Sequence, residues 1–101
     1  TVAGTAEIAV SGSASWTLKV EDAEASSKGG DEGHMTDGDK VLTKPMHVAS
    51  GSTDVNLENS GTLATGAGDE DVGFNLKQEV ESGDESGSYT IKILFTVEAN
   101  F

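Results

Sequence analysis

The residues with the clearest chemical potential are two acidic clusters, Asp37–Gly38–Asp39 and Asp69–Glu70–Asp71. Several carboxylate oxygens that converge from a flexible loop are the ligands that Ca²⁺ prefers. Neither cluster completes the twelve-residue helix–loop–helix pattern, and a solvated acidic loop is the alternative interpretation in a chain this acidic. The candidate calcium ligands are Asp37, Asp39, Asp69 and Asp71. We expect no other cofactor.

Residues for nucleophilic or acid–base catalysis form no recognisable group. The chain has 0 Cys, which excludes thiolate nucleophiles and cysteine–zinc sites, and it contains no Gly–x–Ser–x–Gly motif. His34 lies in a polar loop, and His47 lies between Met46 and Val48 and faces away from them, so we expect both to be surface histidines. Eighteen acidic residues make any pair of carboxylates uninformative for glycosidase chemistry. We expect a protein that is not an enzyme.

The composition restricts the partners. The 101 residues include 6 Lys, no Arg and 18 Asp+Glu, for a formal net charge of −12. One domain is expected at this length. Clustered cations for binding nucleic acid or anionic lipid are missing, and no apolar run approaches the ~18–20 residues that span a bilayer. Residue 1 is Thr rather than Met, so we expect a processed or trimmed chain, through either removal of a secretory signal peptide or a shortened expression boundary. With the first interpretation, we expect an extracellular or cell-surface location.

Apolar residues alternate with polar ones along most of the chain, which is typical of half-buried strands. The clearest run is Ser88–Phe101, in which Tyr89, Ile91, Ile93, Phe95 and Val97 share one face. Leu94 interrupts the polar face of this run, so we expect that face to be covered there. Other alternating sets are Ala6, Ile8 and Val10; Trp16, Leu18 and Val20; Met46 and Val48; Val55 and Leu57; and Phe74 and Leu76. The sequence therefore predicts an all-β fold, a single antiparallel β-sandwich of about six to eight strands, immunoglobulin-like or jelly-roll-like.

The segments between these runs are rich in glycine, serine and acidic residues. Residues 23–40 and 59–71 are expected to be mobile loops, and residues 82–88 a hairpin loop. The segment best suited to a helix is Lys77–Glu85, which Ser82 and Gly83 interrupt.

Both ends of the chain are β-prone and weakly charged. In the N-terminal segment, residues 1–11, the side chains of Val2, Ala6, Ile8 and Val10 lie on one face. Either end can form an exposed sheet edge, which favours pairing with another strand. The two ends can pair within one subunit, or one end can insert into the sheet of a neighbour and build an open filament. We accordingly divide the chain into a candidate donor strand, residues 1–11, and a sandwich domain, residues 12–101, with those four side chains at the subunit interface.

Several short motifs give a resemblance to known proteins. A Gly–x–Tyr–Thr motif, Gly87–Ser88–Tyr89–Thr90, opens the long final strand, and Trp16, Leu18 and Val20 form a Trp–x–Leu–x–Val strand. A glycine-rich loop with Met35–Thr36 follows, and then Leu42–Thr43–Lys44–Pro45–Met46–x–Val48. In these features the chain resembles secreted prokaryotic surface sandwiches of pilus-like and matrix-fibre subunits. In fibre-forming members an N-terminal strand completes the sheet of the neighbour, and residues 2–10 match that role. The absence of cysteine departs from disulfide-bearing pilins, so no particular pilus class is named.

Two functions remain open from the sequence. The leading expectation is a structural subunit of an extracellular filament, pilus or fimbria that forms a homopolymer by donor-strand exchange. The alternative is a monomeric surface module that binds a glycan or calcium. In both cases we expect no nucleic-acid partner and no insertion into a membrane.

Overall fold

The computed structural model describes residues 2–100, and the side chains of residues 4–99. Thr1 and Phe101, the outermost residues of the two predicted terminal strands, lie outside the described residues, as does the side chain of Val2. The elements are β1 (Val2–Val10), β2 (Ser15–Asp22), α1 (Ala25–Lys28), the 3₁₀ turn η1 (Gly29–Asp31), β3 (Thr36–Asp37), β4 (Lys40–Val41), β5 (Met46–Ser50), β6 (Thr53–Asn56), β7 (Gly61–Ala67), β8 (Glu70–Gln78) and β9 (Ile93–Asn100).

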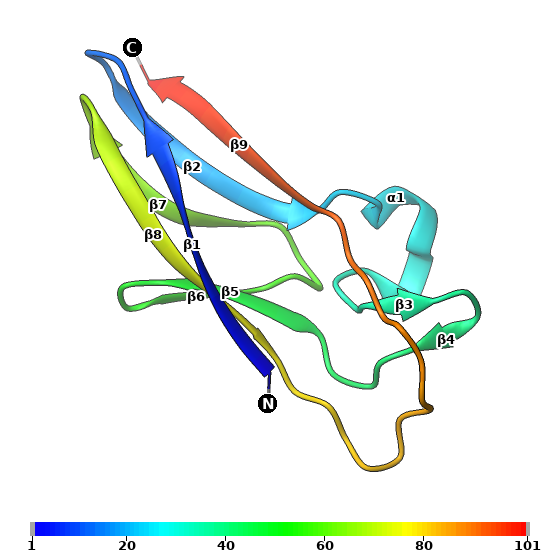
Figure 1. Ribbon diagram of the computed structural model, residues 1–101. Coiled ribbons are helices and arrows are strands. Elements are labelled where there is room, and N and C mark those ends of the chain that lie inside the picture. Colours follow the sequence, from blue (N-terminus) through cyan, green and yellow to red (C-terminus); the bar gives the residue numbers. More distant parts are fainter. Residues whose placement is uncertain (1, 101) are drawn as a thin grey trace.

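The strands form two facing antiparallel sheets and one small hairpin (Figure 1). One sheet has the order β1-β8-β5-β6, and the other has the order β7-β2-β9. Strands β3 and β4 pair with each other beside them. The prediction of an all-β, sandwich-like fold is confirmed. Among the described residues no helix has the length or the apolar character needed to cross a membrane.

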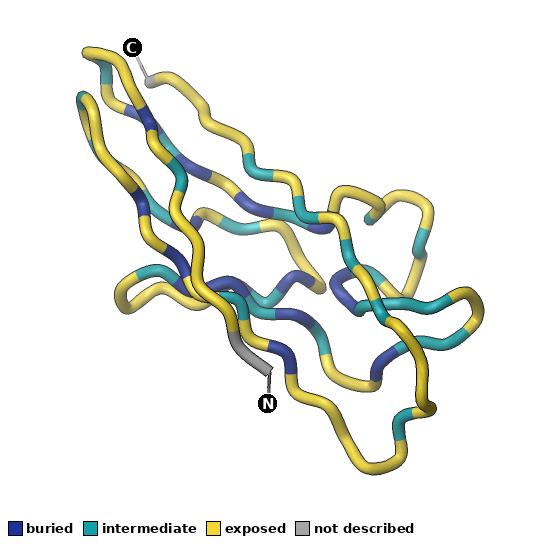
Figure 2. Tube along the Cα trace, in the orientation of Figure 1, coloured by how far each residue is buried: buried dark blue, intermediate teal, exposed yellow. Residues whose placement is uncertain are grey.

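The core lies between the two sheets and follows the period-two pattern of the sequence. Leu18, Val20 and Val48 are fully buried, and buried positions alternate with exposed ones along β2 and β8 (Figure 2). The buried cluster is Val10, Trp16, Leu18, Val20, Met46, Val48, Val55, Leu57, Leu63, Val72 and Phe74. Phe95 of β9 packs on it, with its ring centroid 4.9 Å from that of Phe74. Burial of these apolar side chains is the main source of stability in a fold without disulfides.

Three features predicted from the sequence are wrong: the mobile loop that included residues 61–67, the start of the final strand, and the hairpin loop at residues 82–88. Residues 61–67 form β7 and not a mobile loop, because Leu63 is buried and the strand pairs with β2. The final strand begins at Ile93 and not at Ser88, and before it only Thr90 forms a bridge, with Thr36. Lys77–Glu85, the segment best suited to a helix, forms none, because Lys77 and Gln78 complete β8. Residues 82–88 do not close a hairpin, since β8 and β9 belong to different sheets.

The segment between β2 and β3 was also predicted to be a mobile loop, and it is tied to the sandwich instead. The Asp22 carboxylate, which is buried, accepts hydrogen bonds from the Gly33 and Glu24 N–H groups and lies 2.8 Å from Lys28 Nζ. The Met46 N–H donates to the Gly33 carbonyl oxygen at 2.8 Å. These contacts fix both ends of the segment on strands of opposite sheets.

His34 is buried rather than at the surface. Its Nδ1 lies 2.8 Å from the Leu42 carbonyl oxygen, and its Nε2 lies 2.9 Å from Glu58 Oε2. Both partners are distant from His34 in the sequence. The polar residues that flank His34 therefore predicted a surface position and not these contacts. His47 is half-exposed and faces away from Met46 and Val48, as predicted, and its Nδ1 lies 2.7 Å from Asp54 Oδ1.

Candidate functional site

The candidate site is the edge of the four-stranded sheet formed by β1. This strand pairs antiparallel with β8 in an uninterrupted register that runs from Val2 opposite Gln78 to Val10 opposite Glu70. In the order of that sheet β8 is its one neighbour. In this structure the N-terminal strand therefore pairs within its own chain, and it pairs with β8 and not with the C-terminal strand β9.

The described side chains of β1, those of residues 4–10, contribute little burial. Ala6 and Ile8 lie opposite Phe74 and Val72, whose side chains are buried, so the predicted interface face of β1 points between the sheets. On this face Val10 is buried, Ile8 is half-buried and Ala6 is exposed. Most of the attachment of β1 must therefore come from main-chain hydrogen bonds to β8, which do not depend on side-chain identity.

The connection from β1 to β2 crosses from one sheet to the other in four residues, 11–14. Gly12 adopts φ 145°, a conformation that side-chain-bearing residues rarely take. The Gly12 N–H donates to Asp69 Oδ1 at 2.7 Å, and the Gly68 N–H donates to the Ala14 carbonyl oxygen at 3.3 Å. The β7–β8 turn thus holds this connection at the point where β1 ends and β8 begins.

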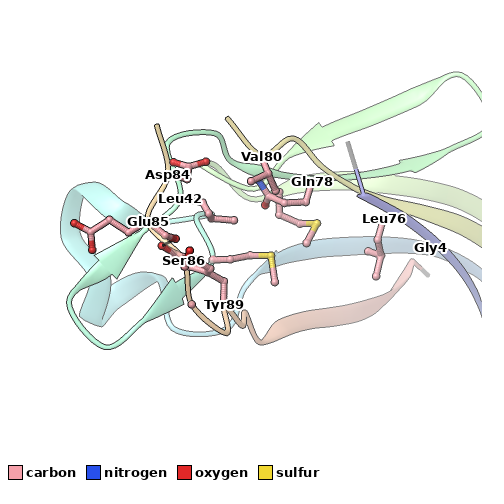
Figure 3. Close-up of a pocket in the computed structure, with 12 residues that line it drawn as sticks. Gly4, Leu42, Leu76, Gln78, Val80, Asp84, Glu85, Ser86 and Tyr89 are labelled. Carbon is pink, nitrogen blue, oxygen red and sulfur yellow. Dashed lines mark hydrogen bonds between the residues drawn. The ribbon is translucent and has the colours of Figure 1, made fainter. Parts of the chain in front are cut away.

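A cavity of about 580 Å³ opens beside the N-terminal half of β1. Its wall on β1 is Gly4, which has no side chain, and its wall on β8 includes Leu76 (Figure 3). The remaining apolar lining is Met35, Leu42, Met46, Val80 and Tyr89. Because a Cβ added at Gly4 would have no atom within 4 Å, the cavity has room for a larger side chain from this strand.

The long connection between β8 and β9 closes the far side of this cavity. Asp84 Oδ1 accepts hydrogen bonds from the Thr43 hydroxyl and N–H at 2.7 and 3.1 Å, and its Oδ2 accepts from the Glu81 N–H at 2.8 Å. The Thr43 hydroxyl bond is the main reason that the pKa of Asp84 lies below its ordinary value. Tyr89 donates to the Glu85 carbonyl oxygen at 2.7 Å. Desolvation, and then the nearby Glu85 carboxylate, raise the pKa of this phenol.

One polar group in the cavity wall is unsatisfied by the described residues. Gln78 is buried, and its Nε2 donates to the carbonyl oxygens of Lys44 and Glu79. Its Oε1 is buried with no hydrogen-bond partner within residues 2–100. Gln78 was not among the site residues predicted from the sequence, although the period-two phase of Phe74 and Leu76 places it on the inner face of β8.

The second sheet edge is β9. It pairs with β2 over its full length, from Ile93 opposite Asp22 to Asn100 opposite Ser15, and it ends its sheet. Leu94 was expected to be covered on its outer face, but it is 45% exposed, and Val97 is 48% exposed. The prediction that each chain end forms a sheet edge therefore agrees with the position of β1 and of β9.

The four candidate calcium ligands lie in two separate places at opposite ends of the molecule, the β3–β4 hairpin and the β7–β8 turn with the start of β8 (Figure 1). Asp37 Oδ2 accepts the Ser88 N–H at 3.0 Å, and Asp69 Oδ1 accepts the Gly12 N–H. Asp39 is exposed in the β3–β4 turn, and Asp71 is exposed on β8 opposite Ala9. Within residues 2–100 no group of three or more His, Asp or Glu side chains is placed to hold a metal ion. Calcium binding stays a prediction from the sequence alone.

The aromatic residues bear on glycan binding, the other part of the alternative function. Trp16 and Phe74 are buried in the core, and Trp16 Nε1 donates to the Gly68 carbonyl oxygen at 3.0 Å. Tyr89 and Phe95 are half-buried. The core positions predicted for Trp16 and Phe74 are confirmed, and these two rings are unavailable as sugar platforms.

Comparison of the chain with protein-family models, with curated proteins and with solved structures found no match in any of the three.

Proposed function

We propose that this protein is a non-catalytic structural subunit of an extracellular or cell-surface filament, polymerised by exchange of β1 between copies. In the exchanged form β1 leaves β8 of its own chain and pairs with β8 of the next copy in the same register. One observation carries this proposal: β1 is an edge strand with a nine-residue register on β8, and its described side chains are mostly exposed.

Exchange of β1 between copies keeps the contacts that β1 makes within its own chain. The main-chain hydrogen bonds between β1 and β8 are the same whether the two strands belong to one chain or to two, so the transfer changes few interactions. Val10, the one buried side chain among residues 4–10 of β1, occupies the same site in either arrangement. The net cost is therefore small, and each added subunit contributes a strand to the sheet of another.

The connection between β1 and β2 supplies a hinge. Residues 11–14 include one glycine at φ 145°, and they are held by the Gly12–Asp69 hydrogen bond rather than by buried side chains. If these residues straighten, β1 extends away from β2 and reaches a neighbouring subunit. Short hinge connections of this kind favour exchange over closed monomers.

The surface charge is compatible with an open chain of subunits. The formal net charge of −12 makes lateral approach of two filaments unfavourable, whereas β1 carries a single acidic residue, Glu7. Pairing through β1 thus adds one carboxylate to each contact, while the acidic turns stay in solvent.

The test is electron microscopy of the full chain and of a variant that lacks residues 1–11. The full chain is expected to form fibres and the truncated chain to form none. Because its β8 still accepts a strand and it has none to donate, the truncated chain added at a few per cent should shorten the fibres of the full chain. Identical fibres from the truncated chain alone would overturn the proposal.

A control separates loss of exchange from loss of folding. A synthetic peptide of residues 1–11 is added to the truncated chain, and folding is followed by circular dichroism. The expected product is a folded, non-polymerising complex, because peptide and chain are no longer joined by the hinge. Fibres formed by this complex would show that polymerisation does not need the covalent link from β1 to β2.

A further inference from the structure

The unpaired edge of β9 has its own hydrogen-bonding groups. The Ala23 N–H donates to the Lys92 carbonyl oxygen at 2.9 Å, in continuation of the register between β2 and β9. Hydrogen-bonded and non-hydrogen-bonded pairs alternate along an antiparallel ladder. The N–H and C=O groups that point away from β2 are therefore those of Ile93, Phe95, Val97 and Ala99.

The same edge leaves large apolar side chains in solvent. Val97 lies opposite Leu18, which is fully buried, so Val97 faces the interior and is nevertheless 48% exposed. Leu94 on the opposite face is 45% exposed. No described strand lies beyond β9 to cover either side chain. An apolar edge with free backbone groups is a template for pairing with another strand.

The charge on this edge is balanced, although the chain is strongly acidic. Residues 88–99 carry one cation, Lys92, and one anion, Glu98, in a chain of formal net charge −12. Lys92, directly before β9, and Glu98, near its C-terminal end, continue the alternation of the outer-facing residues Leu94 and Thr96. A segment whose two ends carry opposite charges is complementary to an antiparallel copy of itself.

We propose that β9 pairs antiparallel with β9 of a second copy of this chain, about a twofold axis at Phe95. Phe95 then lies opposite Phe95 of the second copy, and Ile93 lies opposite Val97. On the outer face Leu94 lies opposite Thr96, and Lys92 lies opposite Glu98. The two three-stranded sheets become one continuous six-stranded sheet.

Three requirements select this register. The residues with free backbone groups have odd numbers, so odd residues must face odd residues. Val97 gains a covering side chain from Ile93. A shift by two residues places Glu98 opposite Leu94 and separates the opposite charges, which removes the favourable cross-strand pair. β6 is a weaker candidate, because it has four residues and carries Asp54.

The proposal is independent of strand exchange through β1, because β9 keeps its place in its own chain. The test uses the full chain, which contains no cysteine. Leu94→Cys and Thr96→Cys are prepared separately and oxidised alone and as a mixture. Residues 94 and 96 form a non-hydrogen-bonded pair with Cα atoms about 4.5 Å apart, within the range of a disulfide. Mass spectrometry of the denatured products identifies the dimers.

The mixture is expected to form the 94–96 disulfide on the order of tenfold faster than either variant alone forms its own dimer, because residue 94 faces residue 96 and not itself. Equal rates in the three samples would overturn the register, and no dimer in any sample would overturn the pairing. Deletion of residues 1–11, with the synthetic peptide of those residues added to complete the fold, abolishes fibres if the proposed function holds and leaves this crosslink unchanged.

A charge exchange supplies the second measurement. Lys92→Glu and Glu98→Lys each place like charges opposite each other twice in the dimer, and each is expected to weaken association in sedimentation roughly fivefold to tenfold. The double variant restores the opposite charges. Glu98 also pairs with Lys19, at 2.6 Å, in its own chain, so the comparison that matters is the double variant with Glu98→Lys. No recovery in the double variant would contradict the proposal.

Discussion

Asp22 and Lys28 form an ion pair of 2.8 Å with side-chain exposures of 0% and 10%, at the point where β2 leaves the sandwich. The Asp22 carboxylate also accepts the N–H groups of Glu24 and Gly33, both at 2.9 Å. The Lys28 ammonium donates to the His34 carbonyl oxygen at 3.1 Å. A single buried carboxylate thus holds both ends of the segment that was predicted from its composition to be a mobile loop.

Asp22→Asn tests this arrangement. The substitution keeps the size of the side chain but leaves the Lys28 ammonium without its counter-charge, so we expect a loss of roughly 3 kcal/mol in the free energy of unfolding. The control is Lys19→Met, which removes the exposed pair with Glu98 and should cost under about 1 kcal/mol. Urea denaturation measures both, and equal losses would contradict a special role for Asp22.

Acid should weaken the same arrangement. Burial by itself raises the pKa of Asp22, but the hydrogen bonds from Lys28, Gly33 and Glu24 together lower it below 3.8, its ordinary value. A carboxyl whose pKa is lowered in the folded state contributes stability above its ordinary pKa, and that contribution is lost as the pH falls through the lowered value. The full chain should therefore lose more free energy of unfolding below pH 3.8 than Asp22→Asn does. If the free energy of unfolding falls equally with pH in the two proteins, Asp22 is not the group responsible for the loss of stability in acid.

Gly33 is predicted to be intolerant of any side chain. It has φ 84°, and an added Cβ would lie 2.3 Å from the Leu57 carbonyl carbon. Gly33→Ala should cost at least about 2 kcal/mol, because a left-handed backbone and a clash with main chain act together. Gly30 is the matched control, since it has an unstrained φ and open space around its Cβ position. Thermal unfolding should separate the two variants clearly.

Gly4→Val should stabilise the pairing of β1 with β8. The new side chain enters the cavity beside Leu76, and valine favours a strand more than glycine does, so we expect a gain of about 1 kcal/mol in the free energy of unfolding. Gly73→Val is the control, because Gly73 also lies in a strand with open space around its Cβ position but faces solvent. If the free energy of unfolding rises equally in both variants, filling the cavity contributes nothing to the stabilisation by Gly4→Val.

The strands with period-two patterns could be predicted from the sequence, and β7 could not. Trp16, Leu18 and Val20 alternate with polar residues, so their buried face was evident. In β7 Leu63 is the one large apolar residue, and small residues fill the rest of the strand. Gly66 is needed there because an added Cβ would lie 2.5 Å from Trp16 Cζ2. Close packing against an indole from another strand leaves no local signal in the sequence.

Only part of the candidate site could be predicted, because local alternation is visible in the sequence and contacts between distant segments are not. The inward face of β1 followed from its alternation, whereas its partner β8 and the cavity beside Gly4 depend on segments far apart in the chain. The burial of His34 likewise depends on its contacts with Leu42 and Glu58. The residues next to His34 in the sequence give no indication of these contacts.

The most direct test of strand exchange uses Glu7 and Gly73, which lie opposite each other in the register of β1 and β8 and are both exposed. Cα atoms of paired residues lie about 4.5–5.5 Å apart, so Glu7→Cys with Gly73→Cys can form a disulfide across the pair. The double variant is assembled under reducing conditions, oxidised and run on a denaturing, non-reducing gel, with Glu7→Cys alone as the control. Exchange of β1 predicts a ladder of covalently linked chains, and the control is limited to dimers. A single band of monomers, each closed by its own disulfide, would contradict the proposed function.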